Sequence, residues 1–80
     1  METDAKPEAS SAIVKHSLAI AGHRTSISLE HAFWEGLKSI AAERGLSIAT
    51  LVARIDAERG AANLSSAIRV FVLNWARSRH

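Results

Sequence analysis

The side chains best suited to chemistry at a surface are Arg24, Ser26 and Ser28, which alternate with less polar residues in one short stretch. A guanidinium donates hydrogen bonds, and a hydroxyl both donates and accepts them. The intervening positions hold Thr25, Ile27 and Leu29. Because successive side chains of a strand point to opposite faces, the stretch predicts a strand over residues 24–29 with one polar and one apolar face.

The sequence contains no pattern typical of a metal site or of catalysis. The histidines are His16, His23, His31 and His80, and none of their spacings puts two imidazoles on one ion. We expect them at the surface, although His16 and His23 lie near Arg24 and could contact phosphates. There is no G-x-S-x-G elbow, no G-x-x-x-x-G-K-[ST] loop and no carboxylate pair beside a nucleophile. We therefore expect neither an enzyme nor a cofactor.

Residues 13–29 are the only part of the chain that looks extended, because they are rich in β-branched and Ser/Thr residues. Upstream of the predicted strand, Leu18 and Ile20 fall on even positions, out of phase with Ile27 and Leu29. A bulge or a tight turn must therefore intervene near Gly22. Both a hairpin and a kinked arm satisfy this pattern.

Three helices are predicted after the strand. The first covers residues 30–44 on the spacing of its apolar residues, with Gly45 placed to accept a positive φ. Ser47 is a good N-cap for the second helix, which should end at Gly60. Asn63 can cap the third helix, in which apolar residues recur at three- and four-residue spacing.

The aromatic and basic residues of these helices allow two interpretations. Trp34, Phe71 and Trp75 lie on or beside apolar stripes, so we expect them in the core or a dimer interface rather than as stacking platforms. The third helix also carries cations, which solvent would normally surround but which could form a secondary patch that contacts a nucleic-acid backbone. They are Arg69, Arg77 and Arg79.

The length of 80 residues indicates one small domain. Because the sequence has no cysteine, the domain has no disulfides and no thiolate metal site. The net charge is +2, but residues 1–12 contribute −2 and leave +4 for residues 13–80, a balance that suits a polyanionic partner. We expect residues 1–12 to form a disordered tail and residues 13–80 to form the domain. Short apolar runs and an acidic start indicate neither a membrane span nor a secretory signal, so we expect a cytoplasmic protein.

The predicted strand has no partner strand in a chain too small for a complete sheet. Unpaired strand edges expose N–H and C=O groups, and pairing with the same strand of a second copy would satisfy them. The resulting antiparallel ribbon would rest its apolar face on helices and leave its polar face open. The major groove of B-DNA, about 12 Å wide, admits such a ribbon.

The sequence resembles the MetJ/Arc ribbon-helix-helix DNA-binding proteins over residues 24–55. The resemblance rests on R-T-S-I-S-L, E-H-A-F-W-E-G-L-K-S-I-A-A-E-R-G and L-S-I-A-T-L-V-A-R-I. The block I-A-G-H-R-T-S-I-S-L-E, followed by F-W and later by G-x-x-N-L-S-S-A-I-R, is similar to a small bacterial subfamily and extends the match to residues 13–76.

The resemblance implies a mainly α fold with a short β-ribbon, a third C-terminal helix, and a two-fold dimer held by intermolecular antiparallel β pairing. It implies double-stranded DNA as the partner and transcription regulation as the role. Its base-facing residues would be Arg24, Ser26 and Ser28. Its phosphate-binding set would be Ser47 with the amides of Ile48 and Ala49, joined by His23.

Two departures from the family keep an alternative open. Better-known members carry larger side chains where this chain has two serines, and they usually end after two helices. If residues 13–20 add a strand to each protomer, the dimeric sheet has four strands, and its width could keep the ribbon out of the groove. The alternative function is a non-catalytic, antitoxin- or adaptor-like protein-interaction module that uses the third helix and the N-terminal arm.

Overall fold

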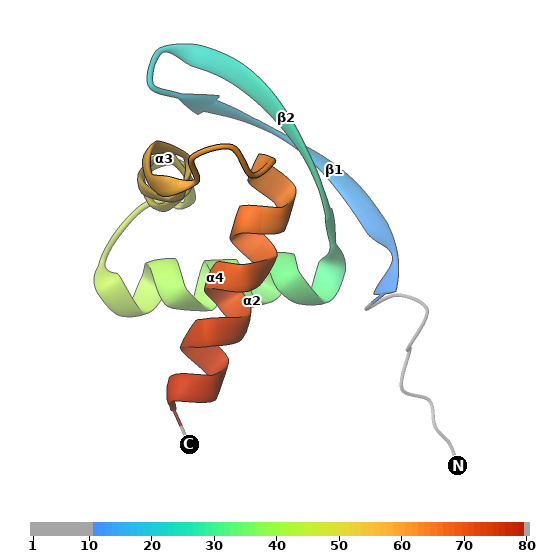
Figure 1. Ribbon diagram of the computed structural model, residues 1–80, viewed down its shortest axis with the longest axis vertical. Helices are drawn as coiled ribbons and strands as arrows, with labels where there is room; N and C mark the ends of the chain where they lie inside the picture. The colour runs from blue at the N-terminus through green and yellow to red at the C-terminus, as the bar shows by residue number, and fades with distance from the viewer. Residues whose placement is uncertain (1–10, 80) are drawn as a thin grey trace.

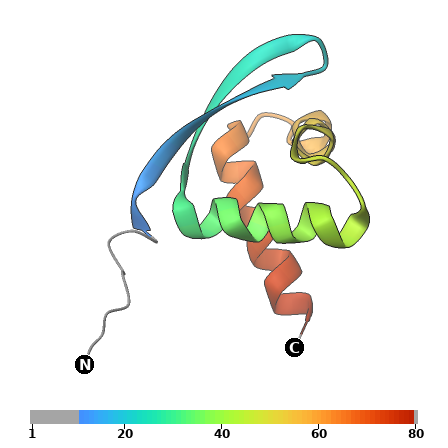
Figure 2. The same cartoon turned by 180° about the vertical axis from the view of Figure 1, so that it is seen from behind.

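The computed structural model describes residues 11–79, and a β-ribbon with helices on one side forms the fold (Figures 1 and 2). This arrangement confirms the predicted mainly α class with a short ribbon and a third C-terminal helix. Of the predicted tail over residues 1–12, residues 1–10 lie outside the described part. The elements are β1 (Ile13–Ile20), β2 (His23–Glu30), α2 (His31–Arg44), α3 (Ile48–Glu58) and α4 (Leu64–Ser78).

The two strands form an antiparallel hairpin within one chain, paired from Ile13–Glu30 to Ile20–His23. Ala21 and Gly22 connect them, with φ angles of 51° and 83°. A two-residue hairpin loop of type I′ needs positive φ at both of its central residues. The expected break near Gly22 is therefore this turn, and the chain forms a hairpin rather than a kinked arm.

The hairpin changes the argument for pairing between two copies. The premise that the predicted strand has no partner in its own chain is wrong, because β1 occupies one edge of β2. The N–H of His31 donates to the C=O of Ala12 at 2.8 Å, so the odd-numbered residues of β2 face β1 through their backbone groups. The even-numbered residues of β2 point their backbone groups to the other edge of that strand, where the Ser65 hydroxyl donates to the Ser28 C=O at 2.9 Å.

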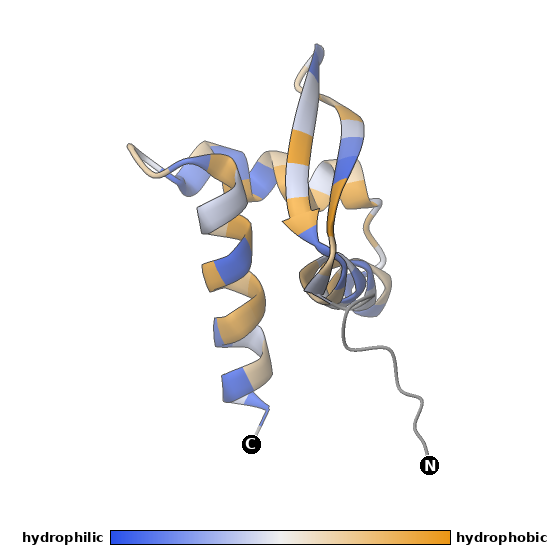
Figure 3. Cartoon of the chain, turned by 90° about the vertical axis from the view of Figure 1, so that its right-hand side faces the viewer, coloured by the Kyte–Doolittle hydropathy of each residue, from blue (hydrophilic) through white to orange (hydrophobic). Residues whose placement is uncertain are grey.

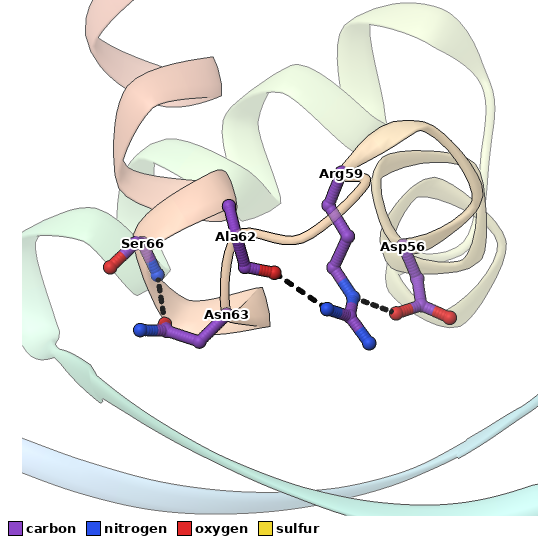
Figure 4. A network of polar contacts seen from close by, with 5 residues as sticks. All are labelled: Asp56, Arg59, Ala62, Asn63 and Ser66. Carbon is purple, nitrogen blue, oxygen red and sulfur yellow. Dashed lines mark hydrogen bonds and ion pairs between the residues drawn. The ribbon is translucent and has the colours of Figure 1, made fainter.

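The predicted helix ends are confirmed by their caps. Gly45 ends α2 with φ 67°, and the Ser47 side chain accepts a hydrogen bond from the Thr50 N–H at 3.0 Å. Asn63 does the same for α4, since its side-chain oxygen accepts from the Ser66 N–H at 2.8 Å (Figure 4).

The loop between α3 and α4 is held by a single arginine. Arg59 Nε donates to the Asp56 carboxylate at 2.6 Å, and its Nη1 donates to the Ala62 C=O at 2.5 Å (Figure 4). Helix α3 ends at Glu58, just before the predicted stop at Gly60, which has a left-handed φ of 61°.

One core joins the inner face of the hairpin to all three helices. Its side chains come from alternate strand positions and from the apolar stripes of the helices, so hydrophobic and polar bands alternate along the strands (Figure 3). Helices α2 and α4 approach closely at Gly36, where an added Cβ would lie 2.8 Å from Val72 Cγ1. The buried residues are Ile20, Ile27, Leu29, Leu37, Ile40, Ala41, Leu51, Val52, Ile55, Ile68 and Val72.

Candidate nucleic-acid interface

The outer face of the hairpin, defined here by Lys15, Ser17, Arg24, Ser26 and Ser28, is exposed and polar. Strand pairing sets Ser17 opposite Ser26 and Lys15 opposite Ser28. The three residues predicted from the alternation of β2 therefore lie on one surface, and β1 adds two more. Sequence reasoning missed Lys15 and Ser17, although they alternate with Leu18 and Ile20, because their place depended on pairing in register.

Arg24 is oriented by a contact across the hairpin. Its Nη1 donates to the Ser17 hydroxyl at 3.2 Å. Long cationic side chains on a surface sample many rotamers, and a hydrogen bond along the ribbon restricts this freedom. The guanidinium thus lies along the outer face with donors still available to a ligand.

The outer face is electropositive, because its two cations have no acid beside them on the strands. The nearest strand carboxylate is that of Glu30 at the end of β2, and Arg69 Nε binds it at 2.8 Å. This hydrogen bond from Arg69 holds the pKa of Glu30 below its ordinary value of 4.5, so the carboxylate stays ionised and paired.

The remaining arginines of the third helix do not form the suggested patch of three free cations. Arg69 is bound to Glu30, and Arg79 Nη1 lies 2.9 Å from the Glu43 carboxylate. The Trp75 indole N–H also donates to Glu43, at 3.1 Å. Of the three, Arg77 alone forms no ion pair within residues 11–79.

The histidines fall into different environments. His23 is exposed beside the turn, but strand alternation puts it on the face opposite to Arg24. His16 is half-buried and stacks on Trp34, with ring centroids 3.6 Å apart and 9° between the planes. The expectation that His16 lies at the surface is therefore wrong, because it packs against a helix of the same chain.

Ser47, the predicted phosphate-binding point, is the N-cap of α3, and this helix lies beneath the tip of the hairpin (Figure 1). The Ser47 hydroxyl accepts from the Thr50 amide and donates to the Thr50 hydroxyl at 2.9 Å. In the described part of the chain, the amides of Ile48 and Ala49 form no hydrogen bond to another group, as is usual for the first turn of a helix. They are the donors that an anion would find there.

Residues 11–79 lack the features of a metal centre and of a membrane span. No three carboxylate, histidine or thiol groups of this range gather as ligands of a metal ion. No helix of the range has the length and apolar character needed to cross a bilayer.

Known proteins resemble the chain in sequence and in fold. Residues 13–76 match a family model described as a ribbon-helix-helix domain. A solved structure of an uncharacterized protein from Bordetella pertussis Tohama I is similar to this chain, with a TM-score of 0.76 and 36% sequence identity. The match covers 86% of this chain and 59% of that protein, so the chain spans little more than half the length of this relative. No curated protein sequence matches significantly.

Proposed function

The chain belongs to the ribbon-helix-helix domain family, and from this premise we propose that it binds double-stranded DNA through the outer face of its β1–β2 hairpin. The observation that carries the proposal is the makeup of that face, which combines Lys15 and Arg24 with three hydroxyl side chains. Cations attract the phosphate backbone, and hydroxyl and guanidinium groups can bond to base edges.

The width of the hairpin supports insertion as a single unit. Neighbouring strands lie about 4.8 Å apart, so a two-stranded ribbon is narrow enough for a major groove about 12 Å wide. Four strands, formed by pairing two hairpins edge to edge, would span about 14 Å before side chains are added. We therefore propose that one chain supplies the complete ribbon, in place of a ribbon shared between two chains.

Individual roles follow from position. Arg24, Ser26 and Ser28 would face base edges, with Ser17 holding the Arg24 guanidinium. Phosphates would be bound by Lys15 from the same face. The other proposed phosphate ligands are His23, Ser47 and the amides of Ile48 and Ala49.

We further propose that the protein acts as a homodimer and as a cytoplasmic, non-catalytic regulator of transcription. A domain of this size buries a limited core, and association with a second copy is a usual source of added stability. Two copies would bring two ribbons to one DNA site, as two-fold proteins do with paired half-sites.

The test is a titration of labelled duplex DNA by fluorescence anisotropy over a series of salt concentrations. Phosphate contacts release counterions, so affinity should fall by tenfold to a thousandfold between about 50 and 200 mM salt. Arg24→Ala should weaken binding, whereas Lys38→Ala removes the same charge from an exposed position on α2 and should not. Equal binding by both variants and the wild type, or no binding at low salt, would refute the proposal.

A further inference from the structure

A groove of about 540 Å³ opens between α3 and α4. None of the residues that line it belongs to the outer face of the hairpin. Leu51 and Ile55 of α3 line it, and Val70 and Phe71 of α4 face them. On each helix the lining residues recur at three- and four-residue spacing, so each helix presents one row of side chains to the groove, and the two helices run across one another (Figure 1). Side chains of two helices thus form an apolar floor, the kind of surface on which an amphipathic helix packs.

The apolar surface of the groove continues onto the exposed side of α4. Val70 is 56% exposed and Leu73, one turn further on, is 50% exposed. These two residues lie outside the core that the chain forms by itself. A contiguous exposed apolar surface of this kind marks a site for contact with another molecule.

The rim of the groove is cationic. Arg54 is exposed, and the Arg44 guanidinium lies 5.2 Å from the centre of the Phe71 ring. Within residues 11–79 neither forms an ion pair, whereas Arg59 on the same rim is bound to Asp56. Glu58 is the single acidic residue among those that line the groove.

We propose that this groove binds an amphipathic helix of a partner protein, whose apolar face is flanked by acidic residues. The apolar floor would bury the helix face, and Arg44 and Arg54 would meet the acidic flanks. A second copy of this chain fits less well, because Arg77 follows the exposed stripe of α4 and would bring a further cation to the arginine rim. A DNA backbone fits less well because it offers nothing apolar to Val70 and Phe71.

The probe for this proposal is a pair of synthetic helical peptides of about 15 residues, four turns each. Both carry leucine on one face at three- and four-residue spacing, and one has glutamate on its flanks where the other has lysine. Anisotropy of the labelled peptides is measured against the full chain and against Arg44→Glu/Arg54→Glu. Arg77→Glu is the matched control, because it reverses one charge on α4 outside the groove, and circular dichroism confirms each fold.

The acidic peptide should bind and the basic peptide should not. The double reversal should lower the affinity for the acidic peptide by about tenfold or more, and Arg77→Glu should lower it by less than about twofold. Equal binding of the two peptides, or no binding of either, would overturn the proposal. Displacement of the acidic peptide by duplex DNA would also overturn the proposal. The same holds if the double variant changes its oligomeric mass but still binds the acidic peptide as the wild type does. DNA binding through the hairpin is measured separately with Arg24→Ala, so either proposal can fail alone.

Discussion

Arg69 Nε lies 2.8 Å from Glu30 Oε1, in an ion pair that ties the third helix to the residue where β2 ends and α2 begins. One turn earlier on α4, the Ser65 hydroxyl binds the Ser28 C=O at 2.9 Å. The two contacts connect the base of the hairpin to α4 and leave its outer face open. The third helix therefore acts as a support for the ribbon as well as part of the core.

The carboxylates on this framework predict acid sensitivity. The hydrogen bond from Arg69 lowers the pKa of Glu30, and those from Trp75 and Arg79 lower the pKa of Glu43. A pKa that is lower in the folded chain stabilises it above the unfolded value, and this stability is lost as pH falls through the folded pKa. Urea unfolding between pH 7 and pH 3 should show stability falling below about pH 4.5, the ordinary value for Glu.

Variants of the two carboxylates identify the source of that loss. Glu30→Gln and Glu43→Gln should each be less stable than the wild type at pH 7 and closer to it at pH 3. Glu35→Gln provides the control, because Glu35 is exposed and pairs with a neighbour on its own helix, Lys38. A pH profile unchanged by all three substitutions would show that these ion pairs do not couple protonation to folding.

The contact between Gly36 and Val72 predicts an unusual response to alanine. In a helix interior, replacing glycine with alanine normally stabilises by about 1 kcal/mol. Here the new Cβ would lie 2.8 Å from Val72 Cγ1, a stiff and nearly buried branch. Gly36→Ala should therefore destabilise by about 1–3 kcal/mol, measured by urea unfolding.

A double-mutant cycle separates crowding from other effects of this substitution. In a Val72→Ala background the space opposite residue 36 is free, so Gly36→Ala should cost much less or become stabilising. If Gly36→Ala costs the same stability in both backgrounds, glycine is not required at position 36 by the close approach of the two helices.

The turn of the hairpin predicts a stabilising substitution. Ala21 has φ 51°, a conformation that costs an L-residue with a Cβ about 1–2 kcal/mol and that asparagine tolerates better. Ala21→Asn should stabilise the chain by about 0.5–1 kcal/mol. Gly22→Ala, at φ 83° with open space around it, should destabilise. Thermal melts of the two variants that move in the same direction would contradict the turn geometry.

The same turn shows how far the sequence could predict the fold. Helix ends were predictable because Gly45, Ser47 and Asn63 act through local chemistry, and all three caps are present. The sequence does not distinguish a hairpin from a kinked arm, because an Ala-Gly pair is a weaker turn signal than Asn-Gly.

Residues that depend on contacts between distant parts of the chain were the ones missed. Lys15 and Ser17 join the outer face only through the register with β2. The stack of His16 on Trp34 requires the packing of β1 against α2, which no local pattern reports.

Cysteine substitutions can test whether the ribbon is formed by one chain. The protein has no cysteine of its own, so introduced thiols report without background. Ser17 and Ser26 are opposite each other, and the hydrogen-bonding alternation makes them a non-hydrogen-bonded pair with Cα atoms about 4.5 Å apart, within disulfide range.

Mild oxidation of Ser17→Cys/Ser26→Cys should give an intrachain disulfide and a monomeric band on a non-reducing gel. The single variant Ser26→Cys should remain largely uncrosslinked if β2 does not pair with its own copy. Rapid formation of a Ser26→Cys crosslinked dimer would instead support a ribbon built by two chains, as the family resemblance implies.

The hydrogen bond between Arg24 and Ser17 predicts that Ser17 acts on DNA through Arg24. Arg24→Ala should weaken binding to a selected site by about 1–3 kcal/mol if the guanidinium meets a guanine edge. Ser17→Ala removes one exposed hydrogen bond and should cost about 0.5–1 kcal/mol of affinity. Because Ser17 would contribute by holding the guanidinium, its substitution should cost almost nothing once Arg24 is alanine.

The cycle is measured by anisotropy against the selected duplex and a scrambled one, at fixed salt. Ser26→Ala is the matched control, since it removes a hydroxyl from the same face that makes no bond to Arg24 within residues 11–79. A Ser17→Ala loss of the same size in both backgrounds would mean that the hydroxyl contacts DNA directly. A loss equal for the two duplexes would place the Arg24 guanidinium on a phosphate, because phosphate contacts carry no direct sequence information.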